Sequence, residues 1–217
     1  MNVTNLYNNR FDANERIRKD EIWRTLVRGF FQKYINATDV VLDMGAGNCE
    51  FINHIQCATK VAVDYSKDIV CYADADVQVL KTRSSDLSKI SDDSIDVVFA
   101  SNFFEHLPDK QDFLTTLDEI ERVLRSTGRL LILQPNIRLL NGRYWDFLDH
   151  HIPLTEHTLV EALQYIGMQI IEIRSRFLPY TTKGRLPHYP WLVYLYLYIR
   201  PAQWMFGKQS WIVAVKP

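Results

Sequence analysis

Apolar positions follow two different periods along this chain. Between residues 13 and 35 they recur every three or four positions, which predicts an amphipathic helix. Beyond residue 37 they gather into short continuous runs, at 40–43, 60–64, 77–80, 95–100 and 129–134. Helical patterns separate these runs, at 50–57, from about 66, and at 112–125. Because continuous apolar strands alternate with helices, the sequence predicts a parallel sheet that is covered on both faces.

The pattern changes after Pro135. Residues 136–154 form a long polar and aromatic connector, which predicts a functional lid. We expect a helix at 155–166, strands at 168–174 and 210–215, and irregular structure between 177 and 208, where Pro, Tyr and Trp are frequent. These elements bring the number of predicted strands to seven, and 217 residues suit a single α/β domain.

Composition and charge narrow the class of protein. Hydrophobic residues make up 47% of the chain and charged residues 24%, as in ordinary globular domains. The three cysteines lack metal-ligand spacing, and the sequence shows neither a signal peptide nor a membrane-spanning apolar run. We therefore expect a cytoplasmic protein with free thiols.

Polar residues and glycines follow the first four predicted strands. Asp43 precedes Gly45 and Gly47, and glycines let the backbone approach a ligand closely. Asp64 follows the second strand, where a carboxylate can accept hydrogen bonds from both hydroxyls of a ribose. The third and fourth strands are followed by Asp86, which suits an adenine amino group, and by Asn102. Because ligands bind beyond the carboxyl ends of parallel strands, the pattern predicts a nucleoside site.

These segments resemble, in order and spacing, the motifs of class I, Rossmann-like S-adenosylmethionine-dependent methyltransferases. The matching segments are DMGAGNC (43–49), VAVDYS (61–66), SSDL (84–87), VVFASNFFEHL (97–107) and STGRLLILQPN (126–136). The resemblance implies a doubly wound, mostly parallel seven-stranded sheet with helices on both faces and an antiparallel last strand. It also implies a single domain with a helical cover (1–36), a cofactor-binding core (37–136) and an acceptor-binding lid (137–217).

The resemblance also assigns roles to single residues. The cofactor would be S-adenosyl-L-methionine, and the product S-adenosyl-L-homocysteine. The implied roles are as follows: Asp43, Gly45 and Gly47 border the methionine half, Asp64 holds the ribose, Tyr65 packs on adenine, Asp86 and Leu87 frame the adenine, and Asn102 lies beside the transferring methyl. The alternative is a nicotinamide dinucleotide site, whose G-x-G-x-x-G pattern needs a small residue where this chain has Glu50.

Three histidines are candidates for a catalytic base. Removing a proton from a hydroxyl acceptor would assist methyl transfer, and histidine titrates near neutral pH. His106 follows the fourth strand, whereas His150 and His151 lie in the connector, where Asp149 could orient a ring. Cofactor support for His106, and local backbone capping for the other two, are the alternatives.

No metal is expected. Glu105, His106 and Asp109 resemble a cluster that binds a divalent ion in some quinol O-methyltransferases, but their spacing is loose. The favoured function is O-methylation of a sugar, a glycolipid or another small-molecule hydroxyl, as a further resemblance given below implies. The alternatives are methylation of a quinol or secondary metabolite, and a non-catalytic partner that binds the cofactor.

The C-terminal segment differs in charge from the rest of the chain. Residues 173–217 contain no acid, and their basic residues are interleaved with ten aromatic ones. Trp and Tyr favour the membrane–water interface, and Lys and Arg favour anionic headgroups. The segment predicts a lipid-linked or diphosphate-bearing acceptor, or peripheral membrane contact; the alternative is a buried aromatic cap on the last strands. An acidic body makes nucleic acid an unsuitable partner. The connector and RFLPYTTKGRLP (176–187) resemble methyltransferases of bacterial surface-polysaccharide and glycolipid biosynthesis.

Overall fold

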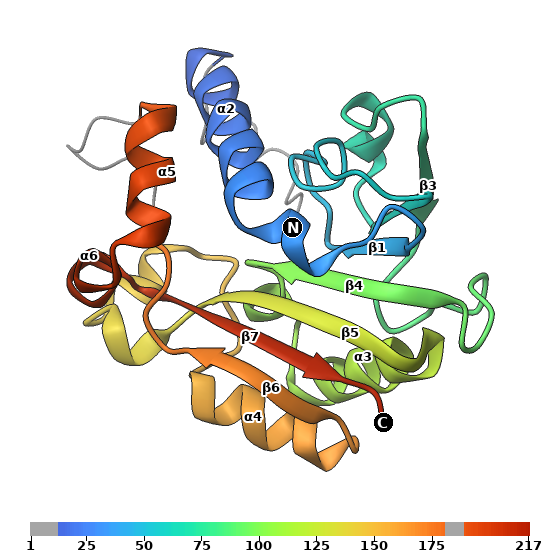
Figure 1. The fold of residues 1–217 in the computed structure, drawn as a ribbon. Helices are drawn as coiled ribbons and strands as arrows, with labels where there is room; N and C mark the ends of the chain where they lie inside the picture. The colour runs from blue at the N-terminus through green and yellow to red at the C-terminus, as the bar shows by residue number, and fades with distance from the viewer. Residues whose placement is uncertain (1–12, 181–188) are drawn as a thin grey trace.

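The computed structural model describes residues 13–180 and 189–217, and a seven-stranded sheet lies at their centre (Figure 1). Its strands are β1 (Val40–Met44), β2 (Thr59–Asp64), β3 (Val77–Lys81), β4 (Ile95–Ser101), β5 (Leu124–Pro135), β6 (Gln169–Arg174) and β7 (Gln209–Val215). Their order across the sheet is β3-β2-β1-β4-β5-β7-β6. Only β7, among these strands, runs antiparallel to its neighbours. The predicted fold class is confirmed.

Helices cover both faces of the sheet (Figure 1). They are α2 (Ala13–Gly29), α3 (Lys110–Val123), α4 (Glu156–Tyr165), α5 (Pro190–Tyr198) and α6 (Arg200–Phe206), with short 3₁₀ turns η1 (Phe31–Tyr34), η2 (Lys67–Cys71), η3 (Phe104–His106), η4 (Ile137–Leu139) and η5 (Arg143–Asp146). Neighbouring residues of one strand point to opposite faces. Leu42 therefore belongs to the core cluster that includes residues of α3 and α4, while Val41 belongs to the one that includes residues of α2 and α5. This two-sided burial explains the continuous apolar runs.

Two predictions of local structure were wrong. Residues 50–57 form turns rather than a helix, with i→i−4 bonds only from Asn53 to Cys49 and from Ile55 to Phe51. The segment is short before β2 begins, so few bonds would offset the cost of nucleating a helix. Residues 177–208 are not irregular throughout, because they contain α5 and α6. Pro190 and Pro201 lie in the first turn of these helices, where proline is tolerated, so they start helices rather than break them.

Candidate functional site

The glycine turn after β1 is held tightly against two neighbouring segments. The amides of Gly45 and Ala46 donate to the carbonyl of Val63, at 2.8 and 3.1 Å. Gly45 has a φ of +68°, and a Cβ there would lie 2.2 Å from the ring of Phe103. Only glycine fits both the left-handed backbone and this close approach.

Two predicted carboxylates lie at this turn. Asp64 at the end of β2 accepts from the amide of Gly47 at 3.0 Å and from that of Ser66 at 2.8 Å, so it joins the turn after β1 to the turn after β2. Asp43 is 3% exposed. Burial raises the pKa of Asp43 well above its ordinary value, and the negative charges of Glu50 and Asp64 raise it further. The turn is therefore an acidic, partly buried site.

The other residues predicted for the nucleoside site have different surroundings. Tyr65 is 63% exposed, and Asp86 is exposed with its carboxylate accepting from the amide of Ser88. Leu87, by contrast, is buried in the core, and its amide donates to Glu119 at 2.7 Å. Asn102 follows β4 with a φ of +49°, and its amide donates to the carbonyl of Leu133.

Two of the three candidate histidines lie together. The rings of His106 and His150 have centroids 5.0 Å apart. Nδ1 of His106 is 2.9 Å from the backbone oxygen of Asp149, and a carbonyl can only accept, so Nδ1 carries the proton. Nε2 is then the nitrogen of His106 that can accept one. The side chain of His151 is exposed, and its amide donates to the carbonyl of Glu105.

A buried carboxylate completes the histidine cluster. Glu105 is 1% exposed and accepts a hydrogen bond from Gln134 at 2.8 Å. Atoms of Glu105, His106 and His150 lie within 4.8 Å of one another, so these three could offer ligand atoms to one cation. Asp109 does not belong to this group, because its carboxylate caps α3 by accepting from the amide of Asp112. The absence of a metal stays a prediction.

The connector approaches the residues after β2. Burial raises the pKa of Tyr65, and among the charges that act on it are those of Asp64 and Asp149. Asp149 lies in the connector and is hydrogen-bonded to His106 through its backbone. The charge of Asp149 in the connector therefore acts on Tyr65, which follows β2.

Sequence reasoning missed several residues around this site. Gln134, which holds Glu105, ends the fifth predicted strand, so its place was detectable although its partner was not. Phe103, which packs on Gly45, lies within the segment 97–107 that resembles a methyltransferase motif, but its residue type alone does not indicate this contact. The aromatic contacts of Tyr144 with His150 depend on the path of the connector, for which the sequence gives no signal.

Comparison with known proteins identifies the central part of the chain. Residues 42–132 match the model of a family described as methyltransferase domain. These residues, less than half of the chain, are thus similar to a methyltransferase domain. The protein is an S-adenosylmethionine-dependent methyltransferase, and S-adenosylmethionine is its cofactor.

Solved structures share the fold over nearly the whole chain. A SAM-dependent methyltransferase from Archaeoglobus fulgidus is 21% identical with a TM-score of 0.68, covering 91% of this chain and 94% of its own. A methyltransferase in complex with the Haloferax volcanii Trm112 activator is 19% identical with a TM-score of 0.69, covering 95% of both chains. One from Methanosarcina mazei is 17% identical with a TM-score of 0.63, covering 86% and 96%. No curated protein matches the chain in sequence.

The acidic turn suits the charge of this cofactor. S-Adenosylmethionine carries a sulfonium and an α-ammonium group, and both are positive. The negative charges of Glu50, which also pairs with Lys19 at 2.8 Å, and of Asp64 act unfavourably on the ionised form of Asp43. A cation placed among them would relieve that repulsion and stabilise the ionised form of Asp43.

Proposed function

We propose that this methyltransferase methylates a hydroxyl group of a sugar, glycolipid or other small molecule, with His106 as the base. The observation that carries the proposal is the 2.9 Å hydrogen bond between Nδ1 of His106 and the carbonyl oxygen of Asp149. With the proton of the neutral ring on Nδ1, Nε2 is the nitrogen that would take the proton of an acceptor hydroxyl, and it lies 4.0 Å from Oε1 of Glu105. The bound cofactor supplies an electrophilic methyl group at the turn formed by Asp43, Gly45, Gly47 and Asp64.

His150 has a supporting role in this proposal. It is 8% exposed, and burial lowers its pKa, so the ring is neutral at neutral pH. Its face lies against Tyr144 and Phe147, with ring centroids 4.8 and 5.3 Å away. We assign His150 to positioning His106 and the connector. His151, whose side chain is exposed, would contact the acceptor only at the rim.

For Tyr65, Asp86 and Asn102 we propose the cofactor contacts that the sequence predicts, and for Leu87 we propose a different role. Tyr65 and Asp86 are exposed and available to an adenine ring, and Asn102 lies at the end of β4. The amide of Leu87 is already bonded to Glu119. Leu87 would therefore support the adenine site from below rather than donate a backbone hydrogen bond to it.

Exposed aromatic residues support a lipid-linked acceptor. Trp191, Tyr194 and Tyr198 on α5 are 64, 50 and 62% exposed, and Trp204 on α6 is 71% exposed. Contiguous exposed apolar groups of this kind mark interaction surfaces. No helix within residues 13–180 and 189–217 is long and apolar enough to cross a membrane. Because Trp and Tyr favour the membrane–water interface, we propose a peripheral contact through these exposed side chains.

The test is an acceptor screen with homocysteine release as the readout, using nucleotide sugars, lipid-linked sugars and quinols. With an active acceptor, His106→Ala should lower kcat by roughly 10²–10⁴-fold while the Kd for the cofactor changes little. His157→Ala is the matched control, because His157 is an exposed histidine on α4.

Three outcomes would contradict parts of this proposal. Full activity of the His106 variant with a hydroxyl acceptor would refute the base assignment. Turnover only with quinols or amines would refute the acceptor class. Cofactor binding by calorimetry without any turnover would identify a non-catalytic partner.

A further inference from the structure

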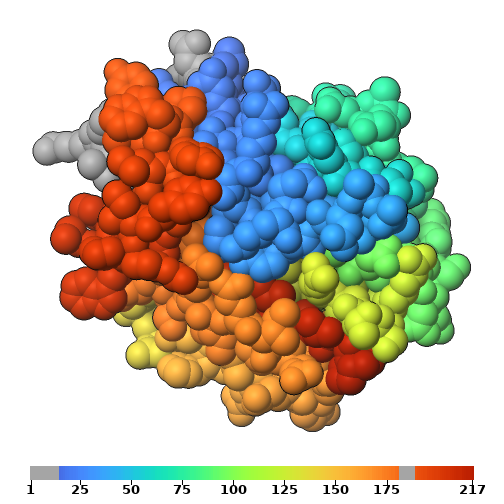
Figure 2. Space-filling model, viewed as in Figure 1, coloured from blue at the N-terminus to red at the C-terminus, as the bar shows by residue number. Residues whose placement is uncertain are grey.

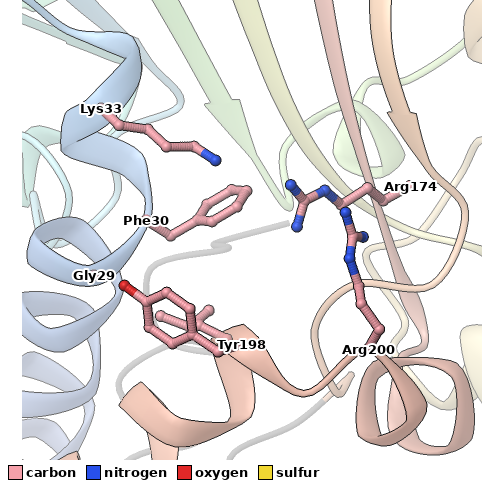
Figure 3. Close-up of a pocket in the computed structure, with 7 residues that line it drawn as sticks. Gly29, Phe30, Lys33, Arg174, Tyr198 and Arg200 are labelled. Carbon is pink, nitrogen blue, oxygen red and sulfur yellow. The ribbon is translucent and has the colours of Figure 1, made fainter.

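A pocket lies apart from the glycine turn, between the end of α2, η1, β6, α5 and α6. Its volume is about 250 Å³, and its lining includes Lys33, Arg174, Arg200 and Tyr198 (Figure 3). This is smaller than the roughly 300–1,000 Å³ of sites for drug-sized ligands, and therefore suits a headgroup rather than a whole lipid. The three cations come from segments far apart in sequence, so the fold alone assembles them.

Aromatic rings hold two of these cations in place. Lys33 Nζ lies 4.2 Å from the ring centroid of Phe30, and the guanidinium carbon of Arg174 lies 4.7 Å from the same centroid. Figure 3 shows Lys33 and Arg174 converging on Phe30, with Arg200 reaching toward Arg174. Burial lowers the pKa of Lys33, and the positive charges of Arg174 and Arg200 lower it further. The positive charges are therefore close enough to repel one another.

Within the described part of the chain, one carboxylate, that of Glu172, contacts the cations that line the pocket. Glu172 accepts from Nε of Arg174 at 2.6 Å and from the hydroxyl of Tyr34 at 2.6 Å. Each of its two oxygens is thus already engaged, and a single negative charge faces three positive ones. An anion in the pocket would remove this imbalance and accept hydrogen bonds from the cations.

The pocket opens beside the exposed aromatic helices. Tyr198 ends α5 and Arg200 begins α6, so the pocket lies at the junction of the two helices. Figure 2 shows α5 as a ridge beside α2 on the surface of the molecule. On α6, Trp204, Met205 and Phe206 are 71, 59 and 43% exposed. Apolar side chains next to an anion site match the layered chemistry of a lipid surface.

We propose that this pocket binds the phosphate group of an anionic lipid while α5 and α6 lie in the membrane interface. Charge argues against a second copy of this chain as the occupant, because residues 189–217 contain no acid and two such faces would repel. The lipid-linked nature of the acceptor rests on the proposed function. Binding to the pocket does not, and it can be measured without cofactor or turnover.

The experiment is vesicle sedimentation of the full chain, without S-adenosylmethionine. Phosphatidylcholine vesicles would contain either phosphatidic acid or a sulfate-bearing lipid at matched surface charge. We expect tighter binding to the phosphatidic acid vesicles. Lys33→Gln and Arg200→Gln should each weaken that binding about fivefold, and the double variant roughly 25-fold, with loss of the preference for phosphate.

Lys89→Gln provides a matched control for loss of charge. Lys89 is exposed and lies between β3 and β4, whereas the pocket lies beside β6 at the opposite edge of the sheet. Trp204→Ala should weaken binding to both kinds of vesicle and leave the preference for phosphate unchanged. Thermal unfolding would establish that each variant folds.

Four results would overturn the proposal. The first is equal binding to the two kinds of anionic vesicle, and the second is a loss of vesicle binding with Lys89→Gln as large as that with Lys33→Gln or Arg200→Gln. The third is calorimetric binding of inorganic pyrophosphate without any binding to vesicles. The fourth is self-association through this face, measured by light scattering. The third would assign the pocket to a soluble phosphate compound, and the fourth to a second copy of the chain. None of them bears on whether the protein transfers methyl groups.

Discussion

Replacing Asp43 with asparagine should stabilise the methyltransferase when no cofactor is bound. The Asp43 carboxylate is 3% exposed, and burial together with the charges of Glu50 and Asp64 raises its pKa. The ionised form is therefore unfavourable in the folded, unliganded chain. Asparagine has nearly the same shape and an oxygen that can still accept from the amide of Ile52, which bonds to Asp43.

The gain in stability expected for Asp43→Asn follows from the absence of a positive charge among the groups that act on Asp43. Replacing poorly compensated buried charges with neutral groups stabilises proteins by about 1–4 kcal/mol. The added amide protons of asparagine need acceptors, so we expect about 1–3 kcal/mol for Asp43→Asn. For a chain of this size each kcal/mol raises Tm by roughly 2–4 °C. The variant should therefore unfold about 2–12 °C above the wild type at pH 8.

The pH dependence gives a second, independent measurement. For an acid whose folded pKa is raised, the cost of ionisation is fully present above that pKa and disappears as pH falls toward the unfolded value of 3.8. The stability difference between Asp43→Asn and the wild type should therefore shrink as pH falls from 8 toward 4. Thermal or urea unfolding of both proteins at each pH would measure it.

A neighbouring aspartate serves as the control. Asp39 is also buried, but its carboxylate accepts from the amide of Asn36 at 2.8 Å, so Asp39→Asn should not stabilise the protein. In contrast to its stability, the cofactor affinity of Asp43→Asn should fall about tenfold or more, because the cationic half of the cofactor loses its countercharge. Equal or lower stability of Asp43→Asn at pH 8, or a difference that does not vary with pH, would refute this reasoning.

Two other substitutions test single contacts of the site. Gly45→Ala should destabilise the protein by more than about 1–2 kcal/mol in urea unfolding, because its Cβ would meet Phe103 at 2.2 Å in a left-handed backbone; Gly47→Ala, with nothing nearer than 4.0 Å, should cost less. Burial lowers the pKa of His150, so the unfolded chain binds more protons and stability should fall as pH drops below about 6.5. For His150→Phe the free energy of unfolding should fall less between pH 7 and pH 5 than it does for the wild type. The same pH dependence in both proteins would contradict this reasoning. His157→Phe, at an exposed histidine, is the control.

Elements with strong local signals were predictable from the sequence. The strand before Asp43 and the strand before Asp64 are continuous apolar runs, and the structure places them within one or two residues of the prediction. The helix expected at 155–166 begins after Thr155, whose side chain accepts from the amide of Thr158. Such caps and runs depend on residues a few positions apart, so their effect is visible in the sequence.

Features that depend on tertiary contacts were not predictable. The fold brings Glu105 to Gln134 and His106 to Asp149, over separations of 29 and 43 residues. Asp109 caps α3 instead of joining the histidines, and its place just before the helix predicted at 112–125 is typical of such a cap. The segment 177–208 is predicted to be irregular because proline marks turns and helix starts alike. In the structure Leu197 of α5 shares a core cluster with residues of α2, a tertiary contact that the sequence does not indicate.

The two parts of the proposed site therefore depend on different kinds of contact, local for the cofactor and tertiary for the acceptor. The proposed cofactor side is a set of strand ends, so a change at one of them, such as Asp64, should act through its own hydrogen bonds to Gly47 and Ser66. The proposed acceptor side is a set of contacts between the connector, η3 and β5, so a change at one member should affect the others. Substitutions that alter acceptor preference should therefore be strongly non-additive, whereas those at Asp64 and Asp86, which share no partner, should combine nearly additively.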